Sequence, residues 1–343
     1  MLGSKEILKI RDFLDQSQNP IFLFDNDVDG LCSFLILRRA MDRGRGVPIK
    51  SFPKLTDQYV RKVEEFGSDA VVILDKAEVS SEFVDAVNEM GVPIMWVDHH
   101  KSESSEKLKS KVEFYSTYPE GEPTTYIAQQ VFGRDEDLWL ALIGCIGDVY
   151  SPIFGKRVEK EYPELFNSEV SAFEALHSTE IGKFVRMLNF GMMDTTTNVI
   201  NLVKYMFNVK SPYDLLEENP RTRQLHKRYS ELNEIYEKQV KKALSSIDEK
   251  EDVILFSYSG HVSMSSEIAN KLYYLYPDKT IIVCFKKPEK INASIRGKGA
   301  LTLTQKIVSE IEGVMGGGHE EATGATIPVD KWEEFKGLVG DKA

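Results

Sequence analysis

Acidic and imidazole side chains follow three short apolar runs in the N-terminal half of the sequence. The run PIFLF leads into DNDVDG (25–30), AVVIL leads into an aspartate, and PIMWV leads into the triplet DHH. A further aspartate lies in GDV (147–149), after a long apolar stretch. Carboxylates and imidazoles together are side chains that bind divalent cations in proteins. The candidate residues are Asp25, Asp27, Asp29, Asp75, Asp98, His99, His100 and Asp148.

The elements around these residues must bring them together for any such chemistry. Apolar runs of five or six residues alternate with helical patterns of about twelve, which is typical of βαβ units and a parallel sheet. Ligands of such sheets bind outside the carboxyl ends of the strands. We therefore expect the acids of three strands to meet at one rim of the sheet.

So many neighbouring carboxylates would repel one another unless cations neutralise them. Mixed carboxylate and imidazole ligands suit Mn²⁺ or Mg²⁺ better than zinc. A carboxylate that bridges two ions gives an arrangement that stabilises the attacking and leaving oxygens of phosphoester hydrolysis. The pattern thus predicts a phosphoesterase site with two metal ions.

Each acid taken alone has a simpler structural explanation. An acid after a strand commonly caps the next helix, and DNDVDG alone is compatible with a turn stabilised by aspartate side chains. An EF-hand calcium loop is not supported, because position twelve counted from Asp25 is Ile36 and not a glutamate. Three strands that all end in acids, together with the DHH triplet, are much harder to explain as caps.

The pattern changes after about residue 155. Helical periodicity continues to about residue 220, and 221–247 form one long polar helix pattern, which suits a helix that links two domains. Strand signals resume in DVILFSYS, TIIVCFKK, INASIR and GATIPV. We therefore predict an α/β protein with two lobes, in which an N-terminal parallel-sheet domain and a smaller C-terminal α/β domain are joined by a long helix.

Composition limits the function further. The chain has 343 residues, room for two domains, and a formal net charge of −11, so a generally basic surface for nucleic acid is absent. Any polyanion must be held by local patches or by bound metal. The three cysteines are far apart, which predicts buried side chains in a reducing compartment. No apolar stretch is long enough for a membrane helix, and we expect a cytoplasmic protein without a membrane partner.

The acidic motifs resemble those of the DHH phosphoesterase superfamily and follow the same order. They read DNDVDG, LDKA (74–77), VDHH (97–100) and GDV. The acid at Asp25, where the small nano-RNase and pyrophosphatase branches have a histidine, resembles the RecJ branch. In the C-terminal half, INASIRGKG (291–299) and GGGHEEATG (316–324) resemble the DHH-associated domain of RecJ and nano-RNase enzymes.

This resemblance implies three segments. Residues 1–215 would form the DHH catalytic, metal-binding domain, 216–250 the linker helix, and 251–343 the DHH-associated substrate-binding domain. It also implies two divalent ions, Mn²⁺ in the first place and Mg²⁺ as the alternative. One ion would be held by Asp27 and Asp75 with support from Asp25. The ligands of the other would be Asp29, Asp75, His99 and Asp148.

The resemblance implies catalytic and substrate-binding roles as well. His100 would contact the scissile phosphate and stabilise its developing charge, while Asp98 would orient the neighbouring histidines. The nucleophile would be a hydroxide that bridges the two ions. Arginine offers paired donors to an anion, and consecutive glycines let backbone amides approach one closely. The residues expected to grip a phosphate or terminal nucleotide are Ser294, Arg296, Gly316, Gly317, Gly318 and His319.

Three functions are compatible with these features. The first is an exonuclease that releases mononucleotides from single-stranded DNA or RNA. The second is a phosphodiesterase or phosphatase for very short substrates, such as nano-RNA, cyclic dinucleotides or 3′-phosphoadenosine 5′-phosphate. The third is a RecJ-like scaffold that binds a GINS-type partner in a replication complex. The complete set of metal ligands favours an enzyme.

The chain also departs from bacterial RecJ. At 343 residues we expect no room for the additional oligonucleotide-binding barrel of those longer proteins. The segment 186–197 resembles a RecJ segment but lacks a following arginine, which argues against a tight, processive grip on single strands. The sequence does not indicate polarity of degradation, preference for DNA or RNA, or oligomeric state.

Overall fold

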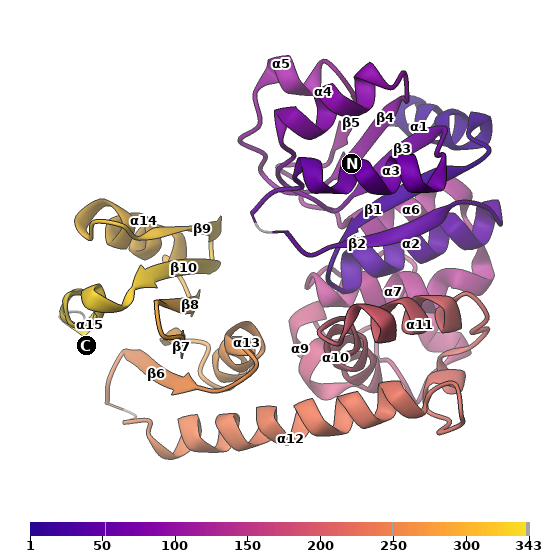
Figure 1. Cartoon of the computed structure of the whole chain (residues 1–343). Coiled ribbons are helices and arrows are strands. Elements are labelled where there is room, and N and C mark those ends of the chain that lie inside the picture. The colour runs from indigo at the N-terminus through magenta and orange to yellow at the C-terminus, as the bar shows by residue number, and fades with distance from the viewer. Residues whose placement is uncertain (52, 249, 341–343) are drawn as a thin grey trace. The chain divides into compact units, whose positions relative to one another are not determined.

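The computed structural model describes residues 1–51, 53–248 and 250–340, and the chain divides into two compact units (Figure 1). Unit 1 contains residues 1–229 and unit 2 contains residues 230–343. The division falls within a long helix, α12 (Arg223–Ser245), inside the predicted linker. The proposed domain boundaries at 215 and 251 stay a prediction, and the final residues of the third segment, 341–343, lie outside the described residues.

Unit 1 is built on a sheet of five parallel strands in the order β2-β1-β3-β4-β5. The strands that the sequence analysis derived from near-continuous apolar runs are buried along most of their length, as expected for a parallel sheet covered on both faces. The strands are β1 (Pro20–Asp25), β2 (Arg45–Ile49), β3 (Ala70–Leu74), β4 (Ile94–Asp98) and β5 (Glu113–Ser116).

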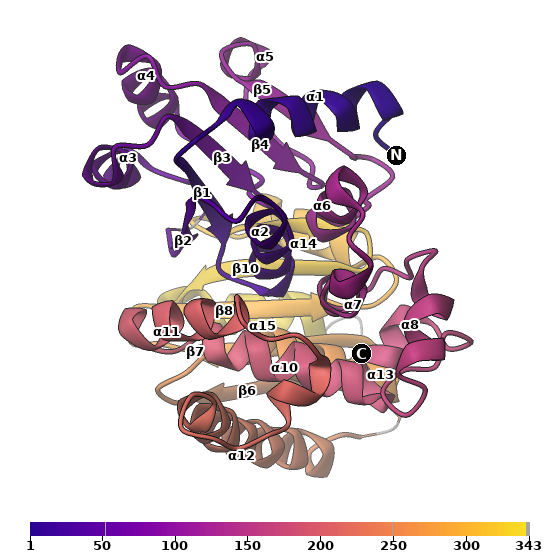
Figure 2. The same cartoon turned by 90° about the vertical axis from the view of Figure 1, so that its right-hand side faces the viewer.

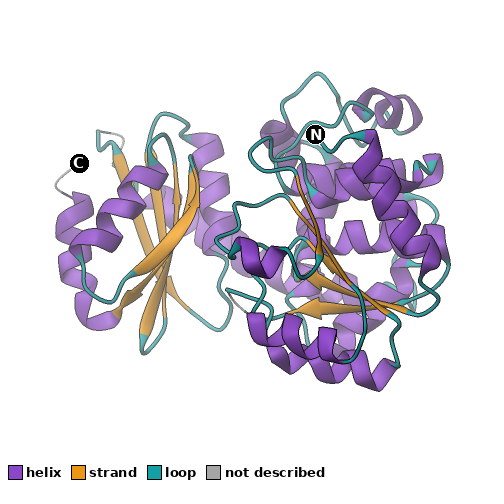
Figure 3. Ribbon diagram, turned by 90° about the horizontal axis from the view of Figure 1, so that it is seen from above, coloured by secondary structure: helices purple, strands orange, loops and turns teal. Residues whose placement is uncertain are grey.

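Helices cover both faces of this sheet and bury two separate apolar clusters (Figures 2 and 3). The larger cluster unites strand residues such as Phe24 and Val97 with α1 (Ser4–Gln16), α2 (Val28–Met41), α6 (Thr124–Phe132) and α7 (Leu138–Gly147). The smaller cluster unites strand residues of the other face of the sheet, such as Trp96, with three helices. These helices are α3 (Val60–Phe66), α4 (Ser81–Glu89) and α5 (Glu106–Lys109).

Four further helices extend the larger cluster beyond the sheet. Three of them pack against α7, which is itself buried at almost every position, and α11 packs against α10 and α2. These helices are α8 (Gly155–Glu161), α9 (Ala172–Ser178), α10 (Glu180–Met192) and α11 (Thr196–Met206). Short 3₁₀ segments complete unit 1 at Asp57–Tyr59, Asp135–Asp137 and Pro212–Leu215.

Unit 2 contains a mixed sheet in the order β6-β7-β8-β10-β9, in which only β6 and β7 run parallel. An apolar cluster joins one face to α14 and α15, and α13 packs against β7 and β8. The strands are β6 (Val253–Ser259), β7 (Thr280–Lys286), β8 (Lys290–Arg296), β9 (Met315–His319) and β10 (Ala322–Pro328). The helices are α13 (Ser265–Leu275), α14 (Ala300–Glu310) and α15 (Trp332–Gly340), with a 3₁₀ segment at Val329–Lys331.

The α/β prediction with two sheets is therefore confirmed. The three cysteines, Cys32, Cys145 and Cys284, are buried and free, as the sequence analysis expected. None of the helices in the described ranges combines the length and apolar character that a membrane crossing requires.

Candidate metal centre

The strand order of unit 1 determines where a ligand would bind. Strand β1 lies between β2 and β3, so the chain leaves β1 towards one side and later returns on the other. Such a switch point opens a crevice at the carboxyl ends of the strands. Asp25 is the last residue of β1, Asp75 directly follows β3, and Asp98 is the last residue of β4. The predicted rim of acids therefore lies at the switch point.

Two residues at this rim have left-handed backbone conformations that are uncommon outside glycine. Asp75 has a φ of 60°, and Val149, which follows Asp148, has a φ of 57°. Strained conformations of this kind persist where the surrounding structure fixes them, often at functional sites. At each of these two positions the chain turns at or next to a carboxylate of the predicted centre, Asp75 or Asp148.

The loop DNDVDG is held against the start of α2. Asp27 caps this helix, and its Oδ1 accepts a hydrogen bond from the Gly30 amide at 2.9 Å. A Cβ atom at Gly30 would lie 2.4 Å from the carbonyl oxygen of Asp25, so only glycine permits this close approach. The helix-cap interpretation is thus correct for Asp27, and it does not remove the carboxylate from the rim.

Asp29 is anchored by a helix that begins far away in the sequence. Its two carboxylate oxygens accept hydrogen bonds from the amides of Thr124 and Thr125, both at 2.8 Å. These amides belong to the first turn of α6, where the helix dipole favours negative charge. This contact was not predicted from the sequence, because no local pattern links the two segments.

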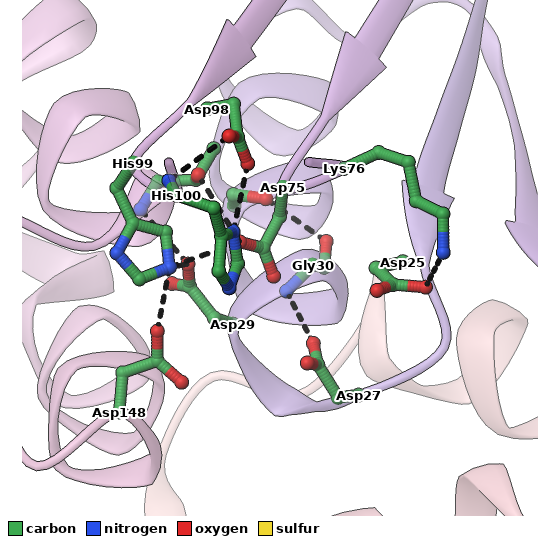
Figure 4. Close-up of polar contacts among 12 residues, drawn as sticks. Asp25, Asp27, Asp29, Gly30, Asp75, Lys76, Asp98, His99, His100 and Asp148 are labelled. Atoms are coloured by element: carbon green, nitrogen blue, oxygen red, sulfur yellow. Dashed lines mark hydrogen bonds and ion pairs between the residues drawn. The ribbon is translucent and has the colours of Figure 1, made fainter. Parts of the chain in front are cut away.

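Three carboxylates converge around His99. Its Nε2 atom lies 2.9 Å from Asp148 Oδ2, 3.3 Å from Asp75 Oδ1 and 3.9 Å from Asp29 Oδ2 (Figure 4). One ligand atom from each of these four residues lies within 4.8 Å of all the others. The structure thus brings together the set expected to hold one ion, from β3, β4, α2 and the end of α7.

This set fits a divalent cation. Oxygen and imidazole nitrogen ligands suit Mn²⁺ and Mg²⁺. Asp75 Oδ2 is buried and has no hydrogen-bond partner among the described residues, and leaving a buried carboxylate oxygen unpaired is costly. A bound cation would satisfy that oxygen.

His100 is positioned by Asp98. Its Nδ1 atom lies 2.9 Å from Asp98 Oδ1, and its backbone amide donates to Asp98 Oδ2 at 2.9 Å. Asp98 is fully buried, so this carboxylate holds the imidazole from within the protein. His100, His99 and Asp75 also form a second convergent set of donors. Among the hydrogen bonds described for Asp98, the imidazole partner is His100.

The other acids of the loop are arranged differently. Asp25 Oδ1 lies 3.1 Å from Lys76 Nζ, and Asp27 faces the Gly30 amide. Within the described ranges, neither Asp25 nor Asp27 belongs to a convergent set of three or more donors. Figure 4 shows Asp25 and Lys76 apart from the group formed by His99 and Asp148. Lys76 was not among the predicted site residues, although LDKA places a cation directly after Asp75.

A pocket of about 390 Å³ opens beside Asp25 and Lys76 within unit 1. It combines two lysines with apolar side chains and two acids. Its lining residues are Asp25, Asn26, Ile49, Lys50, Ser51, Lys76, Met192, Met193 and Asp194.

In the chain without metal, burial and mutual repulsion raise the pKa values of the aspartates. Burial, together with the charges of Asp25, Asp148 and Asp29, raises the pKa of Asp27 to about 7. Burial and neighbouring aspartates likewise raise the pKa values of Asp29 and Asp75.

The pKa values of the two histidines are raised as well, because the neighbouring acids favour the charged imidazole. Burial alone would lower the pKa of His99, but hydrogen bonds and charges from Asp148 and Asp75 raise it to about 12. The pKa of His100 is also raised, because Asp98 outweighs the effect of burial. Protons thus supply the positive charge that a metal ion would otherwise bring.

The predicted substrate-binding residues of unit 2 lie on three adjacent strands. Arg296 in β8 pairs with Ala322 in β10, and Ala322 pairs with His319 in β9. Ser294, two residues before Arg296, pairs with Gly324. Residues that pair directly across antiparallel strands project to the same face. Ser294, Arg296 and His319 therefore share one face of the sheet. Gly316, Gly317 and Gly318 form most of the exposed edge strand β9.

Arg296 is held by neutral groups. Its guanidinium donates to Asn270 Oδ1 at 2.6 Å, to Ser266 Oγ at 2.8 Å, and to the carbonyl oxygens of Ile295 and Thr323. Burial lowers its pKa to about 10, which leaves it charged at neutral pH. An arginine fixed in this way can receive an anion. Ser266 and Asn270, on α13, were not among the predicted site residues.

Comparison with known families and structures agrees with this architecture. The family model described as "DHH family, N-terminal domain" matches residues 21–137, and the DHHA1 domain model matches residues 251–342. No curated protein matches the sequence.

Several solved structures have a similar fold. RecJ from Thermus thermophilus in complex with Mn²⁺ is 16% identical, with a TM-score of 0.72, and the match covers 99% of this chain and 55% of that one. Another structure, exonuclease RecJ bound to manganese, is 16% identical, with a TM-score of 0.63 and coverage of 98% and 94%. The DHH domain of a member of the s1p family of ribosomal proteins is 17% identical, with a TM-score of 0.69 and coverage of 98% and 89%.

The chain thus spans about half the length of the Thermus RecJ chain. At these identities the similarity concerns the fold, while the two family matches cover the first three acidic motifs, up to the DHH triplet, and the Arg296 strand. The chain belongs to the DHH superfamily, combines a DHH domain with a DHHA1 domain, and has the RecJ-like fold.

Proposed function

We propose that this protein is a metal-dependent phosphodiesterase of the exonuclease type, which releases mononucleotides from single-stranded DNA or RNA. The observation that carries the proposal is the convergence of Asp29, Asp75, His99 and Asp148 within 4.8 Å. Two structures of similar fold are RecJ proteins with manganese bound, which supports Mn²⁺ as the ion.

The four converging residues would hold the ion, which when bound supplies Lewis-acid chemistry at a phosphate. His100 would hydrogen-bond a phosphate oxygen and stabilise the charge that develops there. Its raised pKa favours the charged form that this role needs, and Asp98 holds its ring in place. The two-ion arrangement implied by the resemblance stays a prediction, because Asp25 and Asp27 lie outside the convergent sets among the described residues.

In unit 2, Arg296 would bind a phosphate group of the substrate. Its four described acceptors are neutral, so they orient the guanidinium without neutralising it. Ser294, whose hydroxyl donates to Ser265 Oγ at 3.0 Å, and His319 share its face of the sheet and would contribute further hydrogen bonds. The roles of the glycines in β9, a cytoplasmic location and a replication partner stay predictions.

The test is hydrolysis of DNA and RNA oligonucleotides of graded length with Mn²⁺. The strands would be labelled at either end and range from two to about thirty nucleotides, so that the longest exceed the footprints of about 4–16 nucleotides that single-strand grooves occupy. Stepwise shortening of the long strands is the expected result, and the position of the label gives the polarity. Asp75→Asn should abolish cleavage, whereas Asp85→Asn, a change at an exposed acid paired with Lys111, should not.

Other results would redirect the proposal. Cleavage confined to the shortest strands would replace the exonuclease by an enzyme for nano-RNA or dinucleotides. No cleavage of any strand by protein that binds Mn²⁺ would overturn the enzymatic proposal and favour the scaffold.

A further inference from the structure

Helix α13 presents a row of polar side chains to the strand that carries Arg296. Ser266, Asn270 and Tyr273 are spaced as i, i+4 and i+7, which places them on one face of the helix. Ser266 and Asn270 contact Arg296 at the end of β8. Tyr273 donates a hydrogen bond to Glu321 Oε2 at 3.2 Å, between β9 and β10. This row therefore borders the face of the sheet on which Arg296 lies.

The guanidinium of Arg296 is fixed along one edge and exposed along the other. Its Nε atom donates to Asn270 Oδ1 at 2.6 Å, and Nη1 donates to the carbonyl oxygens of Ile295 and Thr323 at 2.9 and 3.2 Å. Nη2 donates to Oγ of the exposed Ser266 at 2.8 Å. A guanidinium has five N–H donors, so one N–H of Nη2 is left without a partner among the described residues. The arginine thus offers one donor, at its exposed end, to an anion.

The groups that fix Arg296 leave its charge in place. An aspartate at position 270 would accept the same hydrogen bond but would also form an ion pair and neutralise the guanidinium. The amide oxygen of Asn270 accepts this bond without a negative charge. The charge of Glu267, on the same helix, raises the pKa of Arg296, but burial has the larger effect and lowers it to about 10. Arg296 is therefore charged and held by neutral groups.

We propose that Asn270 is the positioning residue of Arg296. It fixes the guanidinium through Nε, so that the charge and the remaining Nη2 donor are directed at one phosphate oxygen of the substrate. Ser266 supports this orientation from the preceding turn of α13. Asn270 acts through Arg296 and does not itself contact the phosphate. The identification of the anion as a substrate phosphate rests on the proposed function, whereas the dependence of anion binding on Asn270 does not.

Binding of single strands to chelator-treated full-length protein tests the proposal without hydrolysis. Fluorescence anisotropy would give the Kd of labelled DNA and RNA strands of about ten nucleotides at several salt concentrations. Asn270→Asp keeps the shape and the acceptor but adds a charge. We expect a Kd at least about tenfold higher, as for one lost charge-assisted hydrogen bond. The slope of log K against log salt should decrease by about 0.7, the value for one phosphate contact of a single strand.

A double-mutant cycle separates action through Arg296 from direct repulsion of the strand by the new carboxylate. In an Arg296→Met background, Asn270→Asp should change the Kd by less than about twofold. An equal effect of Asn270→Asp with and without Arg296 would overturn the proposal. Asn292→Asp is the matched control, because Asn292 is also half-buried and lies on β8, four residues from Arg296 and on the same face. It should change the Kd by less than about twofold.

Asn270→Ala separates geometry from charge. This variant removes the acceptor for Nε and adds no charge, so we expect a Kd about threefold or more higher with an unchanged salt slope. An unchanged Kd in folded Asn270→Ala would overturn the proposal, even if Asn270→Asp failed to fold. Thermal unfolding of each variant shows whether it is folded.

Hydrolysis with Mn²⁺ separates this proposal from the proposed function. Asn270→Asp should increase KM by at least about tenfold with kcat little changed. Binding that depends on Asn270 without hydrolysis by any protein would leave this proposal intact and remove the nuclease. Hydrolysis with the same KM in Asn270→Asp and in the unaltered protein would do the reverse. If the unaltered protein neither binds nor hydrolyses a strand, both proposals are wrong.

Discussion

His99 Nε2 lies 2.9 Å from Asp148 Oδ2, although the two residues belong to different motifs and different elements. The same nitrogen lies 3.3 Å from Asp75 Oδ1. A single imidazole N–H can make only one strong hydrogen bond, so two carboxylates compete for it. Carboxylates from two different elements thus converge on one imidazole nitrogen, as expected of a site that binds a cation.

Mn²⁺ binding should therefore release protons and tighten as pH rises. The pKa of His99 is raised to about 12, so the ring is charged at neutral pH and must lose a proton to become a ligand. We expect about one proton released per ion and an affinity that increases up to about tenfold per pH unit. Calorimetry in two buffers of different ionisation enthalpy measures this release. Equal binding enthalpies in both buffers would contradict it.

The stability of the protein without metal should depend on the charge of Asp27. Its pKa rises from 3.8 to about 7 on folding, so its contribution to stability is present below about pH 4 and is lost as pH increases through 7. Asp27→Asn keeps an oxygen that accepts from the Gly30 amide and removes the charge. We expect it to stabilise chelator-treated protein at pH 8 by about 1–2 kcal/mol in urea unfolding, with little change near pH 4.

A buried acid with cationic partners provides the matched control. Asp137 is fully buried, with Arg39 Nε at 3.0 Å and Arg134 Nε at 3.1 Å. Asp137→Asn should destabilise the same protein by about 3 kcal/mol or more, because it leaves a buried arginine without its charge partner. Equal effects of the two substitutions at pH 8 would refute the assignment of repulsion to Asp27.

Much of this fold was readable from the sequence because parallel strands buried on both faces are apolar throughout. Strands β1, β3 and β4 follow that rule. Because they are parallel, the acids at their carboxyl ends could be predicted to meet at one edge of the sheet. Strand β5 was missed, because Glu113–Ser116 is short, half-exposed and at the sheet edge. Strand β9 was not foreseen either, since its three consecutive glycines are poor strand formers that the sheet accepts at its edge.

The positions of some site residues could be predicted from the sequence for the same reason. Residues at strand ends can be placed by topology, but contacts between distant segments cannot. The amides of Thr124 and Thr125 that hold Asp29 depend on how α6 packs against α2. Lys76 was missed because its partner, Asp25, lies on another strand. Such pairings follow from tertiary packing and leave no local signature in the sequence.

Asp98 should control the charge of His100 without holding the metal in the four-donor set. Asp98→Asn removes the carboxylate that raises the His100 pKa, so the fraction of charged imidazole at alkaline pH should fall. We expect kcat to decrease about 10- to 100-fold and the alkaline limb of the pH–rate profile to move to lower pH. Mn²⁺ affinity, measured by calorimetry, should change much less. A loss of activity with an unshifted profile would show a structural role alone.

Arg296 should determine substrate affinity and leave the metal centre unaffected. Its planar guanidinium reaches Asn270, Ser266 and two carbonyl oxygens at once, and a lysine cannot reproduce this fork. Arg296→Lys should therefore increase KM for an oligonucleotide by about tenfold or more, the cost of one lost charge-assisted hydrogen bond, with Mn²⁺ affinity unchanged. Lys290→Gln, at the exposed start of the same strand, serves as the control and should alter neither quantity. An unchanged KM with a lower kcat would show instead that Arg296 acts during the chemical step, and would place its contact with the substrate in the transition state.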